Sequence, residues 1–231
     1  MLSHHRQRLL SIYQRLLKAF GPQHWWPAET PFEVMVGAIL TQNTSWTQVE
    51  KAIQKLKERD LLSLRGLLKV SFSELAEAVR SSGYFNQKAK RLKTWAIFLE
   101  QRYQGDLQAM AAEPLSLLRE KFLGLSGIGP ETADSILLYA LHQPIFVVDA
   151  YTHRIFNRQG ILEEEISYEA LQRFFMDRLP AEAPLFNEYH ALIVREAKEF
   201  CRKNPLCQRC PISEGCLFDK GQIVSRKGSR P

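Results

Sequence analysis

The stretch Leu123-Gly124-Leu125-Ser126-Gly127-Ile128-Gly129-Pro130-Glu131-Thr132-Ala133 joins two amphipathic helical patterns through a Gly-x-Gly turn. Glycine at 127 and 129 allows positive φ and lets a phosphate approach the backbone with no Cβ in the way. Pro130 suits the first turn of a helix, whose unpaired N–H groups then face whatever lies at the turn. The stretch predicts either a plain αα-hairpin with glycine caps or an anion-binding hairpin, and its spacing alone leaves both open.

Helical spacing of apolar residues extends from this hairpin through nearly the whole chain. Gly, Pro and Ser interrupt the helical patterns where helices should end. The nearest candidate strand, 144–148, is too short and has no partner run. We therefore expect an all-α fold of about ten helices with short connections. The patterns cover 9–20, 32–40, 46–57, 73–81, 86–103, 114–122, 131–142, 150–159, 167–178 and 184–200.

The composition is that of a globular chain: 231 residues, 45% hydrophobic and 24% charged. It excludes disordered, collagen-like and disulfide-scaffold classes. The longest apolar run, 136–141, is far shorter than the roughly 18 residues of a membrane span, so we expect no membrane partner. The N-terminal residues lack a signal-peptide pattern, which predicts a reducing cytoplasmic setting, near the nucleoid if the chain binds DNA.

Positive charge is concentrated at the C-terminal end. Lys and Arg total 31 against 25 Asp and Glu, a formal net charge of +6. The segment 201–231 contributes +5 of this, because it holds only two acidic residues beside seven basic ones. Such a local basic segment favours a nucleic-acid partner more than the overall sum does. The seven are Arg202, Lys203, Arg209, Lys220, Arg226, Lys227 and Arg230.

All four cysteines lie in the same segment, as Cys201-x5-Cys207-x2-Cys210-x5-Cys216. One Cys-x-x-Cys flanked by two single cysteines suits a 4Fe–4S cubane held by four thiolates, whereas structural zinc usually takes two paired knuckles. The spacing favours the cluster over zinc, with unliganded cysteines third, and a disulfide does not suit a reducing compartment. The basic residues between the ligands would offset the cluster's negative charge or contact DNA phosphates.

Asp149 follows the apolar stretch 145–148 and begins a helical pattern, twenty residues after Gly129. A carboxylate there is commonly an N-cap. A capping carboxylate is also ionised and rigidly placed, as required to stabilise a cationic sugar transition state or to orient an attacking water. Both roles stay open.

The hairpin, the downstream Asp149 and the four-cysteine loop, in this order, resemble the endonuclease III superfamily of DNA glycosylases. The resemblance implies a six-helix barrel domain at 27–143 that carries the helix-hairpin-helix, and a helical domain from 1–26 and 144–231 that carries the 4Fe–4S loop. It implies a lesion pocket between them with Asp149 as catalytic carboxylate, and a monomer acting on double-stranded DNA that contains a damaged base. Gly127, Gly129 and Thr132 would bind the DNA backbone, with a monovalent cation on nearby carbonyls.

Three further segments are similar to the family. In 40–44, Gln42 looks like the residue that fills the gap left by an extruded base. In 82–89, Tyr84 looks like the intercalating wedge, and 186–192 leads into the cysteine loop as in family members. Taken alone, Gln42 and Tyr84 could also be ordinary surface residues.

Glu131 departs from the pattern of the bifunctional members, in which a lysine at this hairpin position attacks the sugar. A carboxylate cannot form an imine. Lys88 and Lys121 are out of that register. We therefore expect a monofunctional glycosylase without AP lyase activity, which leaves an abasic site.

Trp25-Trp26-Pro27 resembles the bacterial 3-methyladenine DNA glycosylase III branch, which predicts an alkylated base as substrate. An N-alkylated purine is cationic and a good leaving group, so stacked indoles can recognise it by stacking and cation–π attraction. A tryptophan pair can equally be core, and the branch places a pocket lysine where this chain has Leu192. The alternatives are a glycosylase for deaminated or mismatched bases and a non-catalytic DNA-binding protein. His153 and His190 fall on the inner side by the resemblance, and we expect structural roles for both.

Overall fold

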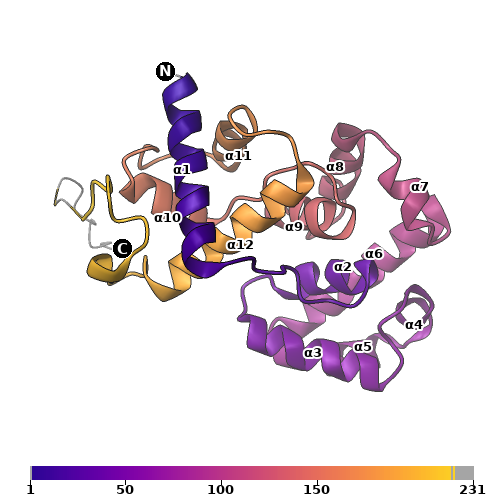
Figure 1. Cartoon of the computed structure of the whole chain (residues 1–231). Coiled ribbons are helices and arrows are strands. Elements are labelled where there is room, and N and C mark those ends of the chain that lie inside the picture. Colours follow the sequence, from indigo (N-terminus) through magenta and orange to yellow (C-terminus); the bar gives the residue numbers. More distant parts are fainter. Residues whose placement is uncertain (1, 220, 222–231) are drawn as a thin grey trace. The chain divides into compact units, whose positions relative to one another are not determined.

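The structure, a computed structural model, describes residues 2–219 and 221; those residues contain no β-strand (Figure 1). The all-α prediction is confirmed. Of the basic C-terminal segment, Lys220, Arg226, Lys227 and Arg230 lie outside the described residues. The α-helices are α1 (Leu2–Phe20), α2 (Pro31–Leu40), α3 (Trp46–Glu58), α4 (Leu64–Lys69), α5 (Phe72–Ala78), α6 (Phe85–Tyr103), α7 (Leu107–Ala111), α8 (Leu115–Leu123), α9 (Pro130–Ser135), α10 (Ala150–Arg158), α11 (Tyr168–Met176) and α12 (Ala183–Glu199).

The chain divides into two compact units. One is continuous, Trp26–Ile145, and the other combines Met1–Trp25 with Phe146–Pro231. These bounds lie within two residues of the domain limits that the resemblance implies. That these two units are the predicted domains, one with the helix-hairpin-helix and one with the cluster loop, stays a prediction.

Helix α2 lies at the centre of the continuous unit. It contacts α3, α6 and α9, and every residue from Glu33 to Leu40 is buried. A helix that is apolar on all sides must be enclosed in this way. Thr30 caps its start by accepting a hydrogen bond from Glu33 N at 3.1 Å. Trp95 of α6 packs edge-on against Phe122 of α8, with ring centroids 4.9 Å apart, and closes the other side of this core.

An aromatic cluster forms the core of the second unit. Phe146 stacks on Phe175 of α11 at 4.4 Å between ring centroids and meets Phe186 of α12 edge-on at 5.3 Å. The Tyr189 hydroxyl of α12 donates to Leu9 O of α1 at 2.7 Å, so a buried hydroxyl has its partner and α1 is fastened to α12. Segment 145–148 is buried as an extended coil and leads directly into α10.

Two predicted elements differ from the structure, and two short helices were not predicted. The pattern at 131–142 is α9 followed by a π-helical turn, η2 (Ile136–Ala140), all five residues of which are buried. The pattern at 73–81 is α5 followed by a 3-10 turn, η1 (Arg80–Ser82). Helices α4 and α7 were not expected, since six and five residues are too few to show a periodic pattern.

No helix among the described residues is both long enough and apolar enough to cross a bilayer.

Candidate functional site

Asp149 is the N-cap of α10. Its Oδ1 accepts from Thr152 N at 2.7 Å and from the Thr152 hydroxyl at 2.9 Å. This confirms the capping interpretation, and the same geometry fixes the carboxylate: one oxygen is bound to the helix start, which leaves Oδ2 to face outward from the cap.

His190 of α12 supplies the second contact of this carboxylate. Its Nε2 lies 3.6 Å from Asp149 Oδ2, and the two side chains are only 9% and 13% exposed. Burial opposes ionisation of Asp149, but His190 and the two Thr152 donors outweigh it and lower the pKa of Asp149 below its usual value. Asp149 is therefore an anion at neutral pH. His153 lies elsewhere, with Nε2 3.2 Å from Glu163 O.

The hairpin between α8 and α9 has the backbone expected of its glycines. Gly127 adopts φ +83°, which an L side chain rarely takes. Gly129 is exposed, and a Cβ there would meet no atom within 4 Å. Open space above the backbone beside a helix N-terminus suits the approach of a phosphate, so the geometry permits anion binding as well as the plain hairpin.

Gln42 reaches this hairpin from the loop after α2. Its Nε2 donates to Gly127 O at 3.0 Å and to the Thr132 hydroxyl at 2.9 Å. Thr132 is buried, and its hydroxyl oxygen accepts the hydrogen bond from Gln42. The structure thus brings three of the predicted DNA-contacting residues together within one unit.

Tyr84 is the N-cap of α6 and projects into solvent, with 63% of its surface exposed and φ at +46°. A large aromatic ring so exposed on a left-handed residue fits an intercalating wedge. Lys88, one turn later, is fully buried and donates from Nζ to Ser82 O at 2.5 Å, which anchors the base of the loop. Burial, with the nearby charge of Arg91, lowers the pKa of Lys88 to about 8.

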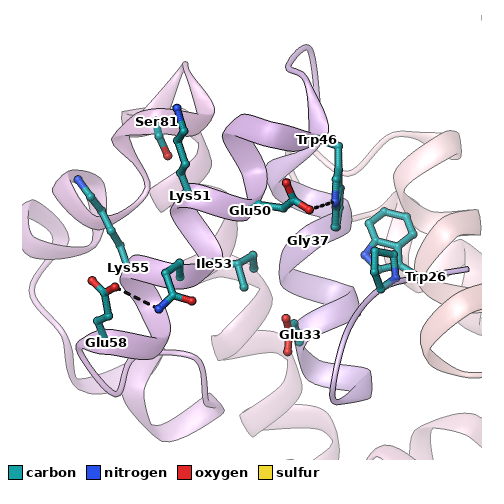
Figure 2. A pocket seen from close by; sticks show the side chains of 12 residues that line it. Trp26, Glu33, Gly37, Trp46, Glu50, Lys51, Ile53, Lys55, Glu58 and Ser81 are labelled. Carbon is teal, nitrogen blue, oxygen red and sulfur yellow. Dashed lines mark hydrogen bonds between the residues drawn. The ribbon is translucent and has the colours of Figure 1, made fainter. Parts of the chain in front are cut away.

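Trp26 belongs to an aromatic group that the sequence had not indicated. Its ring meets Trp46 edge-on at 5.2 Å and Tyr139 at 5.3 Å. The Trp46 indole N–H donates to Glu50 Oε1 at 2.7 Å. The rings of Trp26 and Trp46 line one end of a cavity of about 680 Å³, which Glu33 also lines (Figure 2). Trp25 lies in the other unit.

The four cysteines line a single cavity between α10, α12 and the C-terminal loop. No three His, Cys, Asp or Glu side chains of the described residues stand in a ready-made metal-binding arrangement. The donor set nevertheless fits the cluster: four sulfurs, apolar walls from Ile155, Phe200 and Ile212, and Arg158 Nη1 3.4 Å from Cys201 Sγ.

Three of the four thiols in this cavity have raised pKa values. Burial raises the pKa of Cys201 and Cys207, and burial together with the Glu196 carboxylate raises that of Cys210. Cys210 Sγ lies 3.1 Å from Glu196 Oε1, and burial in turn raises the pKa of Glu196 to about 7. Only a metal centre's positive charge would hold these sulfurs as thiolates.

The structure places two further residues at these sites that the sequence analysis missed or undervalued. His190 is 41 positions from Asp149, and only the packing of α10 on α12 brings them together. Trp46 is the first residue of the helical pattern 46–57, and an aromatic residue in such a pattern is usually interpreted as part of the core. The spacing Trp26, Gly37, Trp46 gave no signal, although a Cβ on Gly37 would lie 3.3 Å from Trp26 Nε1, so the glycine makes room for the ring. Leu192, at the position of the branch's pocket lysine, is fully buried.

Several known proteins are similar to this chain. The family model described as the HhH-GPD superfamily of base excision DNA repair proteins matches residues 36–181. A protein of Methanocaldococcus jannaschii, whose name assigns it provisionally as a DNA repair glycosylase, is 49% identical over 91% of this chain and 96% of its own length. Endonuclease III of Thermotoga maritima is 31% identical over 93% of this chain and 97% of its own. The crystal structure of H. pylori 3-methyladenine DNA glycosylase bound to 1,N6-ethenoadenine is 33% identical, with a TM-score of 0.71 over 84% of this chain and 95% of that one.

Proposed function

The chain belongs to the HhH-GPD superfamily of base excision DNA repair proteins, and from this premise we propose that it is a monofunctional DNA glycosylase for alkylated bases. It would extrude a damaged base from duplex DNA and hydrolyse its N-glycosidic bond. The observation that carries the proposal is the Asp149 carboxylate, fixed through Oδ1 and facing His190 through Oδ2.

Asp149 supplies the electrostatic part of the reaction. The C1′–N bond breaks, the base leaves with the electron pair, and the sugar becomes an oxocarbenium-like cation that the carboxylate stabilises. A water oxygen then bonds to C1′, and its proton passes to the carboxylate or to solvent. Because the pKa of Asp149 is held low, the group is charged when the cation forms. His190 would keep Oδ2 in place.

The absence of lyase activity rests on the residues near the hairpin. Glu131 occupies the lysine position and cannot form an imine. Lys121 is bound to Glu113 at 2.6 Å and Lys88 to Ser82 O, so both amines are committed to the fold. The expected product is an intact strand with an abasic site.

The aromatic group around Trp26 supports an alkylated, cationic base. Rings present electron-rich faces, and the carboxylates of Glu33 and Glu50 line the same cavity (Figure 2). The H. pylori relative is a 3-methyladenine DNA glycosylase. We propose that Trp25 and Trp26 bind the substrate, as the sequence predicted, and that Trp46 does so as well. Since Leu192 offers no charge, recognition here would depend on the rings and on Glu50, because the Glu33 carboxylate is already paired with Lys57 Nζ at 3.1 Å.

A 4Fe–4S cluster on Cys201, Cys207, Cys210 and Cys216 would fix the C-terminal loop, whose described basic residues then face DNA phosphates. Cluster binding supplies the folding free energy of this loop. The hairpin carbonyls would hold a monovalent cation beside the phosphate that Gly127, Gly129 and Thr132 bind. The protein would act as a monomer on damaged double-stranded DNA.

Base release from a panel of duplexes tests the proposal. The panel contains 3-methyladenine, 7-methylguanine, 1,N6-ethenoadenine, thymine glycol, uracil and a G·T mismatch, and free base is measured by chromatography. We expect release of alkylated purines alone. Release of uracil or thymine instead would favour the mismatch alternative, and release of nothing would favour a non-catalytic DNA-binding protein.

A further inference from the structure

Arg91 of α6 makes the third contact of the Gln42 side chain. Its Nη1 donates to Gln42 Oε1, while Gln42 Nε2 donates to Gly127 O and to the Thr132 hydroxyl. The amide nitrogen thus donates both of its hydrogens, and the amide oxygen uses one of its two lone pairs. The amide of Gln42 has one orientation, with its oxygen toward the guanidinium.

The stem of Arg91 also lies against the hairpin. A Cβ added to Gly127 would meet Arg91 Nε and would lie 2.9 Å from both Cγ and Cδ. Glycine at 127 therefore serves two purposes: it allows φ +83° and it leaves room for this side chain. One arginine is packed on the hairpin backbone and hydrogen-bonded to the Gln42 loop.

Helix α6 connects this arginine to the wedge. Tyr84 is the N-cap of α6, and Arg91 lies about two turns further along. The helix is stiff and its Lys88 is anchored on Ser82 O. A displacement of the wedge, the Gln42 loop or the hairpin would therefore be transmitted to the other two through Arg91.

We propose that Arg91 is a positioning residue that fixes the Gln42 amide against the hairpin and so couples entry of Gln42 into the duplex to binding of the DNA backbone. The proposal rests on the proposed function in taking DNA with an extruded base as the ligand, and on the predicted role of Gln42 as the residue that fills the gap. A charge-assisted hydrogen bond of this kind is worth about tenfold in an equilibrium constant or somewhat more.

Binding without catalysis tests the proposal. The probe is a duplex that carries a tetrahydrofuran abasic-site analogue opposite 2-aminopurine, compared with the intact duplex. Anisotropy gives affinity, and 2-aminopurine emission reports a side chain entering the gap. We expect Arg91→Ala and Gln42→Ala each to reduce the preference for the gapped duplex about tenfold and to abolish the emission change.

The coupling shows in the combined variant. Arg91→Ala with Gln42→Ala should bind no more than about twofold worse than either alone, because each removes the same interaction. Arg91→Lys, which retains one donor, should recover part of the emission change. Lys90→Ala is the matched control: Lys90 is the exposed neighbouring cation on α6, and its loss should weaken binding to both duplexes equally.

Three results would overturn the proposal: Arg91→Ala behaving like Lys90→Ala, the two losses multiplying in the double variant, or no preference of the wild-type protein for the gapped duplex. Thermal unfolding of each variant excludes misfolding as the cause. Since no bond is cleaved in this assay, a protein that releases no base can still show the coupling, and an active glycosylase can still lack it. The two proposals therefore fail separately.

Discussion

His190 Nε2 lies 3.6 Å from Asp149 Oδ2, on the carboxylate oxygen that the α10 cap does not use. One oxygen of Asp149 thus caps α10, and the other is available for the proposed chemistry. Helix capping and catalysis were competing interpretations of this residue in the sequence, and the geometry is compatible with both at once.

Replacing Asp149 by Asn should abolish base release and leave the fold intact. Asparagine can still cap α10 through its side-chain oxygen, but it carries no negative charge for the sugar cation. We expect single-turnover release to fall about a hundredfold or more, with DNA affinity little changed. Asp106→Asn is the control, because Asp106 caps α7 with Oδ1 at 2.9 Å from two backbone N–H groups. Equal rates in the two variants would remove Asp149 from the mechanism.

The wild-type protein should give no covalent adduct with abasic DNA under borohydride. Glu131 cannot form an imine, so gel analysis should show free protein and an uncut strand. Glu131→Lys places an amine at the register of the bifunctional members and should yield a trapped species. An adduct with the wild-type protein would contradict the monofunctional assignment.

Charge at Glu50 should set the preference for cationic bases. Glu50→Gln keeps an oxygen that accepts the Trp46 N–H, but removes the carboxylate charge. Release of 7-methylguanine should slow by about three- to tenfold relative to neutral 1,N6-ethenoadenine, a difference of roughly 1 kcal/mol. Glu58→Gln is the control, because Glu58 is on the same helix but lines the end of the cavity away from the two tryptophan rings (Figure 2). It should leave the ratio of the two release rates unchanged. A shift of equal size in both variants would show only a general loss of negative charge.

Lys88 should make stability rise with pH between about 8 and 10.5. In this window the unfolded chain retains the lysine proton while folded Lys88, with its lowered pKa, has released it, so the free energy of unfolding increases as pH rises. The increase is at most about 3 kcal/mol. Urea unfolding of Lys88→Met should lack this part of the pH dependence, whereas Lys90→Met should retain it. Parallel curves for wild type and Lys88→Met would contradict the assignment.

Anaerobically purified protein should contain about four iron and four sulfide per chain, consistent with four thiolates on one cubane. Cys216→Ser removes the buried ligand and should lose the visible absorption together with the ordered C-terminal loop, seen as faster proteolysis after α12. Ser213→Ala, in the same loop, should retain both. One zinc per chain and no sulfide would contradict the cluster. It would favour structural zinc, which the cysteine spacing ranked second.

The sequence predicted whatever depends on neighbours along the chain. Periodicity gave the long helices, and the glycines gave the hairpin with Gly127 at positive φ. It could not give the π-helical turn at Ile136–Ala140, because the continuous apolar run 136–141 has no spacing that tells one helical winding from another. Nor could it give Arg91 on Gln42, which are 49 residues apart and meet only through the packing of α2 against α6.

Helix α1 is fastened to α12 by Tyr189 and Leu9, near opposite ends of the chain. During synthesis, α1 ends at Phe20 and α12 begins at Ala183, so at about 5–20 residues per second α1 waits roughly 8–33 s for its partner. The continuous unit can complete its core in that interval. Leu9 and Leu16, which are fully buried in the folded protein, stay exposed to other chains and chaperones until α12 is made. We expect nascent-chain aggregation to depend on the apolar face of α1, and folding of the discontinuous unit to be the slower of the two because of its high contact order.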